Sequence, residues 1–292
     1  MNNINPWGDV VLPSRPAYRF SAMWLTLLFA LINIVVWFWQ LHYASPLPEQ
    51  EYNLLLAGAN VYQLSLTGDW WRYLTSMTLH ADPVHLVINT LALIVIGINC
   101  EAMAGKIRML FIYLVSGIAA SFVSATWLWS QRGGFSAYEI PITVSVGASG
   151  AIMGIAGAVM MYLIRARTDP SVSVADRLRY KNLLITIISL LLLTLLSSLH
   201  NNDDTATDNV AHISGFICGA TMGWLYAAAS GIHKTGMDRW SCLISAVSAG
   251  LIILLLSAGS GSHDRRLMLE REMILDEIGI MVNAQAEKQL ND

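Results

Sequence analysis

The sequence contains few charged residues and no paired cysteines. Only 13% of its 292 residues are charged, against about 25% in an ordinary soluble domain, whereas 55% are hydrophobic. This balance is typical of a membrane protein. The net charge is only −3 and no dense run of lysine and arginine occurs, so we expect no nucleic-acid partner. Three cysteines without paired spacing favour free packing thiols over disulfides or metal ligands; they are Cys100, Cys218 and Cys242.

Seven apolar segments are long enough to cross a hydrocarbon core about 30 Å thick, which needs roughly 20 apolar residues. They lie near Ala22–Gln40, Val84–Ala104, Met109–Trp129, Gly147–Ile164, Leu183–Leu199, Val210–Ala228 and Trp240–Ala258. The first is longer than the apolar stretch of a signal peptide, so we expect an uncleaved anchor. The expected fold class is an all-α polytopic membrane protein.

Lysine and arginine are unevenly distributed between the two sides of these segments. If the N-terminus is cytoplasmic, eleven basic residues lie on the cytoplasmic side and two, Arg72 and Arg132, lie in the opposite loops. The eleven are Arg15, Arg19, Lys106, Arg108, Arg165, Arg167, Arg177, Arg179, Lys181, Lys234 and Arg239. Because basic residues concentrate in cytoplasmic loops, we expect the N-terminus inside and the C-terminus outside.

The chain divides into a membrane core and two appendages. We expect residues 1–20 to form a short cytoplasmic segment, 21–230 a core of six membrane helices, and 231–262 a linker with the seventh helix. Residues 263–292 carry apolar side chains at helical spacing, which predicts an amphipathic helix outside the membrane. Such a helix either lies free at the interface or docks on a partner. The apolar positions are Leu267, Met268, Met273, Ile274, Ile278, Met281 and Val282.

The first outer loop, between residues 43 and 83, is unusually long. A loop of this length with its own structure is usually functional. It contains the apolar stretches Tyr52–Ala57, Val61–Leu66 and Trp70–Leu74. The Trp71-Arg72 pair suits the lipid headgroup region, so the alternative is an aromatic belt with no further role.

Ser149 lies in the sequence Gly147-Ala148-Ser149-Gly150, at the start of the fourth segment. It precedes Arg165, at the inner end, by about 24 Å of helix at 1.5 Å per residue. Ser149 therefore lies several ångströms below the outer edge of the hydrocarbon core. Exposed N–H groups and the helix dipole favour a developing negative charge there. The alternative role for Ser149 is that of a helix N-cap.

His212 lies a few residues inside the sixth segment, on a face lined with glycine. Small residues let membrane helices approach closely, and a similar glycine stripe follows Ser149. The two stripes therefore predict that Ser149 and His212 come within hydrogen-bond distance, where the histidine can act as the base that a serine nucleophile needs. With no carboxylate near His212 at its depth, we expect a dyad. The alternative is tight helix packing with an incidental histidine. The stripes are Gly215, Gly219 and Gly223, and Gly150, Gly154 and Gly157.

A third polar cluster, with His80, His85 and Asn89, lies at the outer end of the second segment. His85 and Asn89 share a helix face, and both can donate hydrogen bonds to an oxyanion. The alternatives are helix capping and metal binding. No third ligand has helical spacing with the two histidines and the pattern H-E-x-x-H is absent, so we expect no metal and no cofactor.

Together these motifs resemble those of the rhomboid intramembrane serine proteases. They are Gly-Ala-Ser-Gly opening a helix, Ala-His-x-x-Gly-x-x-x-Gly on a later helix, and His-x-x-x-x-His-Leu-x-x-Asn before both. Trp71-Arg72 in a long first outer loop is similar as well. The resemblance covers roughly residues 20–230 and implies a six-helix bundle. The seventh segment looks like the variant with one helix added after that core.

The resemblance implies a role for each motif residue. Ser149 is the nucleophile and His212 is the general base, then the general acid. His85, Asn89 and the backbone N–H of Ser149 form the oxyanion hole. The expected structural residues near the site are His80, Gly147, Gly150, Met153, Trp71, Arg72, Gly215 and Gly219. Met153 stands where the family often has an aromatic residue; because a thioether can pack on an imidazole, we expect activity to persist.

The resemblance also implies the substrates and the location. The substrates are single-span membrane proteins that enter laterally from the lipid bilayer, past the fifth helix, and are cut in or near the transmembrane segment. The site faces the periplasm from a bacterial inner membrane, with quality control or processing of membrane proteins as the biological role. Two alternatives are a rhomboid-like pseudoenzyme, disfavoured by the intact motif residues, and a transporter or channel, disfavoured by the lack of paired broken helices.

Overall fold

A computed structural model describes residues 23–43, 47, 49–131, 142–170, 172, 174–200, 209–231, 235–259 and 261–291. The side chains of residues 193–200 are outside this description. The expected N-terminal segment 1–20, Arg132 and the loop 201–208 also lie outside the described residues.

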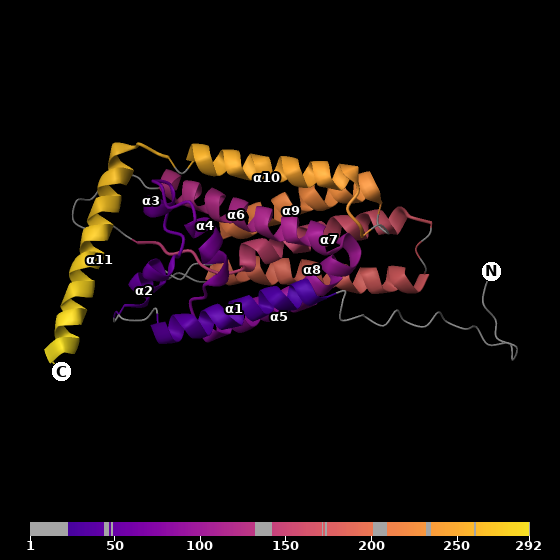
Figure 1. The fold of residues 1–292 in the computed structure, drawn as a ribbon. Helices are drawn as coiled ribbons and strands as arrows, with labels where there is room; N and C mark the ends of the chain where they lie inside the picture. Colours follow the sequence, from indigo (N-terminus) through magenta and orange to yellow (C-terminus); the bar gives the residue numbers. More distant parts are fainter. Residues whose placement is uncertain are drawn as a thin grey trace, which may run out of the picture.

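Seven long helices run side by side in the described part of the chain (Figure 1). They are α1 (Trp24–Tyr43), α5 (Pro83–Ala104), α6 (Lys106–Gln131), α7 (Ser149–Thr168), α8 (Val174–His200), α9 (Asn209–Ser230) and α10 (Arg239–Gly259). Each coincides with one of the seven apolar segments. The described residues form no strand beyond one isolated bridge between Asn60 and Ser145, which confirms the all-α fold class.

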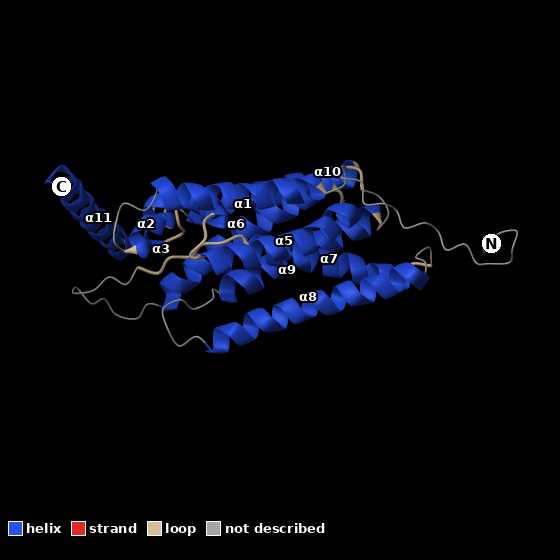
Figure 2. Ribbon diagram, turned by 90° about the horizontal axis from the view of Figure 1, so that it is seen from below, coloured by secondary structure: helices blue, strands red, loops and turns tan. Residues whose placement is uncertain are grey.

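Five of the described helices combine the length and hydropathy that a membrane span requires, namely α1, α5, α6, α7 and α10. In α8 the apolar stretch among the described residues is shorter, Tyr180–Leu192. This helix lies at one edge of the bundle (Figure 2). The helix α9 contains glycine, serine and histidine, but it packs along α6 and α7 inside the bundle. Because protein rather than lipid surrounds much of α9, small and polar residues are tolerated there.

The helix α7 forms the centre of the bundle. Of its most apolar window 72% is buried, against 17% in α10. Its neighbours are α5, α6 and α9, and its first three turns contain mainly glycine, alanine and other small or aliphatic residues. The helix that begins at Ser149 is therefore held on several sides.

A buried carboxylate of α5 accepts hydrogen bonds from the first backbone N–H groups of α1. Glu101 accepts hydrogen bonds from the backbone N–H groups of Leu25 (3.2 Å) and Thr26 (3.0 Å), and from Oγ1 of Thr26 (2.8 Å). The first N–H groups of a helix lack intrahelical partners, so Glu101 supplies them from a neighbouring helix.

The helix α10 is attached to the bundle through Arg108 of α6, a fully buried residue. Its Nε donates to Oγ of Ser241 (3.0 Å) and its Nη2 donates to the carbonyl oxygen of Gly236 (2.6 Å). These bonds lie at the end of α6 remote from the first outer loop.

The first outer loop is folded over one end of the bundle. It contains α2 (Gln50–Ala57), α3 (Tyr62–Ser65), α4 (Arg72–Thr75) and the 3-10 helix η2 (Ser76–Thr78). Arg72 is buried and its Nη1 donates to the carbonyl oxygens of Leu55 (2.8 Å) and Ala59 (3.2 Å). An aromatic belt alone does not account for this internal structure.

The last helix, α11 (Arg265–Asn291), runs across the same end of the bundle, past α3 and α2 (Figure 1). Leu267, Ile274 and Ile278 are buried, packed against residues of the first outer loop. Met268, Met273 and Val282 are exposed. This tail therefore docks on its own chain, an alternative that the sequence pattern did not raise.

Candidate active site

Ser149 and His212 face each other across the contact between α7 and α9. Nε2 of His212 lies 2.7 Å from Oγ of Ser149, within hydrogen-bond distance. Ala148 occupies the N-cap position of α7 and Ser149 is its first helical residue, so the N-cap role for Ser149 is wrong. Ser149 is partly exposed and His212 is 9% exposed. A serine hydroxyl bonded to an imidazole is the arrangement that activates a serine nucleophile.

Glycine allows the two helices to approach this closely. A Cβ atom on Gly215 would overlap the carbonyl oxygen of Gly150, and one on Gly219 would overlap that of Gly154. The two glycine stripes thus meet as the sequence predicted. Any side chain at these positions separates α9 from α7.

Gly147 allows α5 to lie close to the start of α7. Its φ is +119°, a conformation that side chains rarely adopt. A Cβ atom built on Gly147 would lie 2.8 Å from Cε1 and Nε2 of His85 and 3.7 Å from Nδ2 of Asn89. The side chains of His85 and Asn89 therefore lie beside the turn that leads into Ser149.

Asn89 is buried and has a defined orientation, because its Nδ2 donates to the carbonyl oxygen of His85 (3.0 Å). The capping role in this cluster belongs to another residue. Asp82 is the N-cap of α5 and accepts a hydrogen bond from the backbone N–H of His85 (2.9 Å). Capping thus explains Asp82 but not the side chains of His85 and Asn89.

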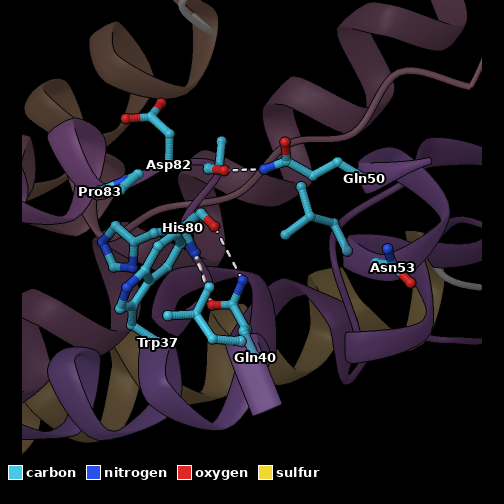
Figure 3. A pocket seen from close by; sticks show the side chains of 10 residues that line it. Trp37, Gln40, Gln50, Asn53, His80, Asp82 and Pro83 are labelled. Carbon is cyan, nitrogen blue, oxygen red and sulfur yellow. Dashed lines mark hydrogen bonds between the residues drawn. The ribbon is translucent and has the colours of Figure 1, made fainter. Parts of the chain in front are cut away.

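His80 lies behind His85, fully buried. The two rings are 5.2 Å apart between centroids and are inclined by 67°. The backbone of His80 forms a reciprocal pair with the Gln40 side chain, with distances of 3.0 and 3.1 Å (Figure 3). Burial and the nearby His85 lower the pKa of His80 to about 4. A neutral, packed His80 supports the ring of His85.

A cavity of about 300 Å³ lies next to His80, between α1, α2 and the start of α5 (Figure 3). Its polar lining consists of Gln40, Gln50, Asn53, His80 and Asp82. Ser149, His212 and His85 do not line it, whereas His80 does.

Of the remaining predicted structural residues, Trp71 and Arg72 lie in the first outer loop and Met153 lies on α7. Trp71 is 40% exposed, and the guanidinium of Arg72 lies 4.6 Å from the centre of its ring. Met153 is buried on α7, four residues after Ser149. No group of three side chains suited to a metal ion occurs among the residues described.

Sequence reasoning missed the residues that hold the segment before Ser149. The N–H of Gly147 donates to the carbonyl oxygen of Ser76 (2.8 Å). Asn60 and Ser145 form two backbone hydrogen bonds, of 3.1 and 2.9 Å. These are backbone contacts between distant parts of the chain, and no pattern of side chains in the sequence predicts them.

Known proteins resemble this chain along most of its length. The Rhomboid domain family matches residues 67–229. The chain is 41% identical over 280 residues to the rhomboid protease AarA of Providencia stuartii, covering 94% of this chain and 95% of that protein. It is 31% identical over 244 residues to the rhomboid protease GluP of Bacillus subtilis, covering 81% of this chain.

A plant relative, RHOMBOID-like protein 4 of Arabidopsis thaliana, is 32% identical over 170 residues. The chain spans 42% of the length of GluP and 37% of that of the plant protein, but nearly all of AarA. The family match begins inside the first outer loop and ends within α9. The chain belongs to the rhomboid family of intramembrane serine proteases.

Proposed function

We propose that this protease hydrolyses peptide bonds in or near the transmembrane segment of single-span membrane proteins, with a dyad of Ser149 and His212. The observation that carries the proposal is the 2.7 Å contact between Oγ of Ser149 and Nε2 of His212. It joins the partly exposed end of α7 to a buried imidazole on α9.

In the first half of the reaction, Oγ of Ser149 attacks the carbonyl carbon of the scissile bond while Nε2 of His212 takes the hydroxyl proton. The tetrahedral intermediate collapses, and His212 returns this proton to the leaving amine. An acyl-enzyme on Ser149 remains. Water then attacks the ester carbon as His212 accepts a proton from it, and His212 finally gives that proton back to Oγ.

The oxyanion of each intermediate is stabilised by the backbone N–H of Ser149 and by the side chains of His85 and Asn89. Ser149 is the first residue of α7, where N–H groups have no intrahelical acceptor and the helix dipole favours negative charge. The position of His85 and Asn89 beside Gly147, two residues earlier, supports their part in this role.

Removal of either side-chain donor is expected to reduce catalysis more than binding. His85→Ala and Asn89→Ala should each lower kcat by about 10²–10³-fold, the usual effect of losing one oxyanion donor. The measurement is the cleavage rate of a reporter substrate in proteoliposomes. Asn99→Ala is the matched control, because Asn99 is a half-buried residue of α5 whose Nδ2 donates to the carbonyl oxygen of Val95. Equal rates for Asn89→Ala and Asn99→Ala would remove Asn89 from the oxyanion hole.

The protein is a multi-pass membrane protein, and we place it in a bacterial inner membrane with its N-terminus in the cytoplasm and its site facing outward. Ser149 opens α7, whereas Arg165 and Arg167 lie in the last turn of that helix. Basic residues concentrate on the cytoplasmic side, so this polarity supports an outward Ser149. In this proposal residues 1–20 are on the inside and α11 is on the outside.

Access to the scissile bond requires local unwinding of the substrate helix, since the backbone groups of an intact membrane helix are paired internally. We therefore propose that substrates carry glycine, proline or polar residues near the cleavage site and enter laterally from the bilayer. Processing or quality control of single-span proteins is the biological role consistent with such a substrate.

The test uses the purified protein in proteoliposomes with a tagged single-span reporter that carries glycine and alanine near its outer boundary. A fluorophosphonate probe, which labels activated serines, is added in parallel. We expect reporter cleavage and a single labelled residue, Ser149. Labelling without cleavage would contradict the substrate proposal, and cleavage without labelling of Ser149 would contradict the dyad.

A further inference from the structure

The helix α11 contacts the first outer loop through an ion pair. Nη2 of Arg271 lies 2.7 Å from Oδ1 of Asp69, and both side chains are largely shielded from solvent. Nη1 of Arg271 donates to the carbonyl oxygen of Leu64 (3.2 Å) and to Oγ1 of Thr67 (3.1 Å). One guanidinium thus holds α3 and the turn that follows it.

Asp69 links Arg271 to Arg72, which is buried within the first outer loop. Its other oxygen, Oδ2, accepts a hydrogen bond from Nε of Arg72 (2.9 Å). Burial raises the pKa of Asp69, but the hydrogen bonds from Arg271 and Arg72 outweigh it and hold the pKa below the ordinary value. Asp69 is therefore ionised between two guanidinium groups. Arg72 in turn binds the carbonyl oxygens of Leu55 and Ala59.

Asn60, which follows Ala59 in the chain, is hydrogen-bonded to the segment that leads to Ser149. Its backbone N–H donates to the carbonyl oxygen of Ser145 (3.1 Å), and the N–H of Ser145 donates back (2.9 Å). Ser145 precedes Ser149 by four residues. A continuous series of hydrogen bonds therefore runs from Arg271 through Asp69, Arg72 and the Ala59–Asn60 peptide to the turn before Ser149.

Apolar packing joins the same parts. Ile274 and Ile278 of α11 form one buried cluster with residues of the first outer loop, and side chains from the segment before Ser149 pack against it. The loop members are Leu55, Val61 and Leu64, and those of the segment are Ile142 and Val144. The helix α11 therefore packs against both the first outer loop and the segment that precedes Gly147.

We propose that α11 is a positioning element of the active site, in which Arg271 holds the first outer loop and thereby the 142–147 segment that orients Ser149. The inference rests on the proposed function, because Ser149 must be the reacting residue for its position to affect rate. A small displacement of a reacting group is enough to change the rate of chemistry substantially.

The test is Arg271→Ala in the full chain, reconstituted in proteoliposomes. We expect kcat and the rate of fluorophosphonate labelling of Ser149 both to fall by about three- to tenfold, with KM within about twofold of the wild type, because a misplaced nucleophile slows chemistry without removing substrate contacts. Arg271→Lys should recover part of the rate, since an ammonium can pair with Asp69 but lacks the planar fork of donors.

The matched control is Arg265→Ala, on an exposed residue of the same helix. Combining Arg271→Ala with Asp69→Asn should cost less than the sum of the two single effects, as expected for groups in one network. Thermal denaturation of each variant separates the folded fraction from the rate per folded molecule. A loss confined to the folded fraction, or an equal loss in Arg265→Ala, would overturn the proposal.

Amide hydrogen exchange at Ser145 supplies a measurement that needs no catalysis. Arg271→Ala should accelerate this exchange, because the pairing of Asn60 with Ser145 loses its support. Unchanged exchange contradicts the proposal even in an inactive preparation. A wild type that neither cuts nor labels contradicts the proposed function instead, so the two failures are distinguishable.

Discussion

Ser149→Ala is expected to abolish cleavage, with kcat lowered by at least about 10⁴-fold, as for other serine nucleophiles that act with a histidine base. Alanine removes the hydroxyl that lies 2.7 Å from Nε2 of His212, and with it the nucleophile. His212→Ala should cause a loss of similar size, because the hydroxyl then lacks a base. The double variant should be no worse than either single one, since the two residues act as a unit.

Ser214→Ala is a suitable control for these variants. Ser214 is on α9, two residues after His212, and its Oγ donates to the carbonyl oxygen of Val210 (2.6 Å) rather than to the site. Its activity should stay close to that of the wild type. The measurement is reporter cleavage per folded molecule. Persistent cleavage by Ser149→Ala would rule out the serine mechanism.

Gly219→Val is expected to be the most disruptive single change in the bundle. Already a Cβ atom at this position overlaps the carbonyl oxygen of Gly154, which is backbone and cannot rotate away. The helices must separate, and overpacking of this kind costs about 3 kcal/mol or more. Separation at Gly219 also moves His212 away from Ser149. We therefore expect a lowered midpoint of thermal denaturation and loss of fluorophosphonate labelling.

Gly250→Val provides the matched control for Gly219→Val. Gly250 is on α10, and a Cβ atom there would have nothing within 4 Å. This variant should denature at the temperature of the wild type and retain labelling. An equal effect of the two substitutions would show that added bulk in any membrane helix, not the contact of α7 with α9, causes the loss.

The helices and the dyad could be predicted from the sequence because a few local rules govern them. Membrane-spanning backbone must be helical to pair its own hydrogen-bonding groups, so apolar length alone located α1, α5 and α10. Helical periodicity aligned Gly215 and Gly219 with His212, and Gly150 and Gly154 with Ser149. Because small residues favour close approach of helices, the pairing of α7 with α9 followed.

The sequence also predicted that His85 and Asn89 share a face, but not that they lie beside Gly147. It indicated Ser149 as a possible N-cap, whereas Ala148 takes that position. Distinguishing the two requires the backbone conformation around residue 147, where φ is +119°. That conformation depends on the hydrogen bond from Gly147 to Ser76, a residue of the first outer loop.

The tertiary structure alone decided which surfaces meet. An amphipathic pattern shows that one face of residues 263–292 is apolar, but it does not identify what covers that face. The structure places Ile274 and Ile278 on the first outer loop and Arg271 on Asp69. Likewise, Glu101 reaches the start of α1 and Asn60 pairs with Ser145. Periodicity specifies the face of each element, whereas partners far apart in sequence are selected by the packing of the whole chain.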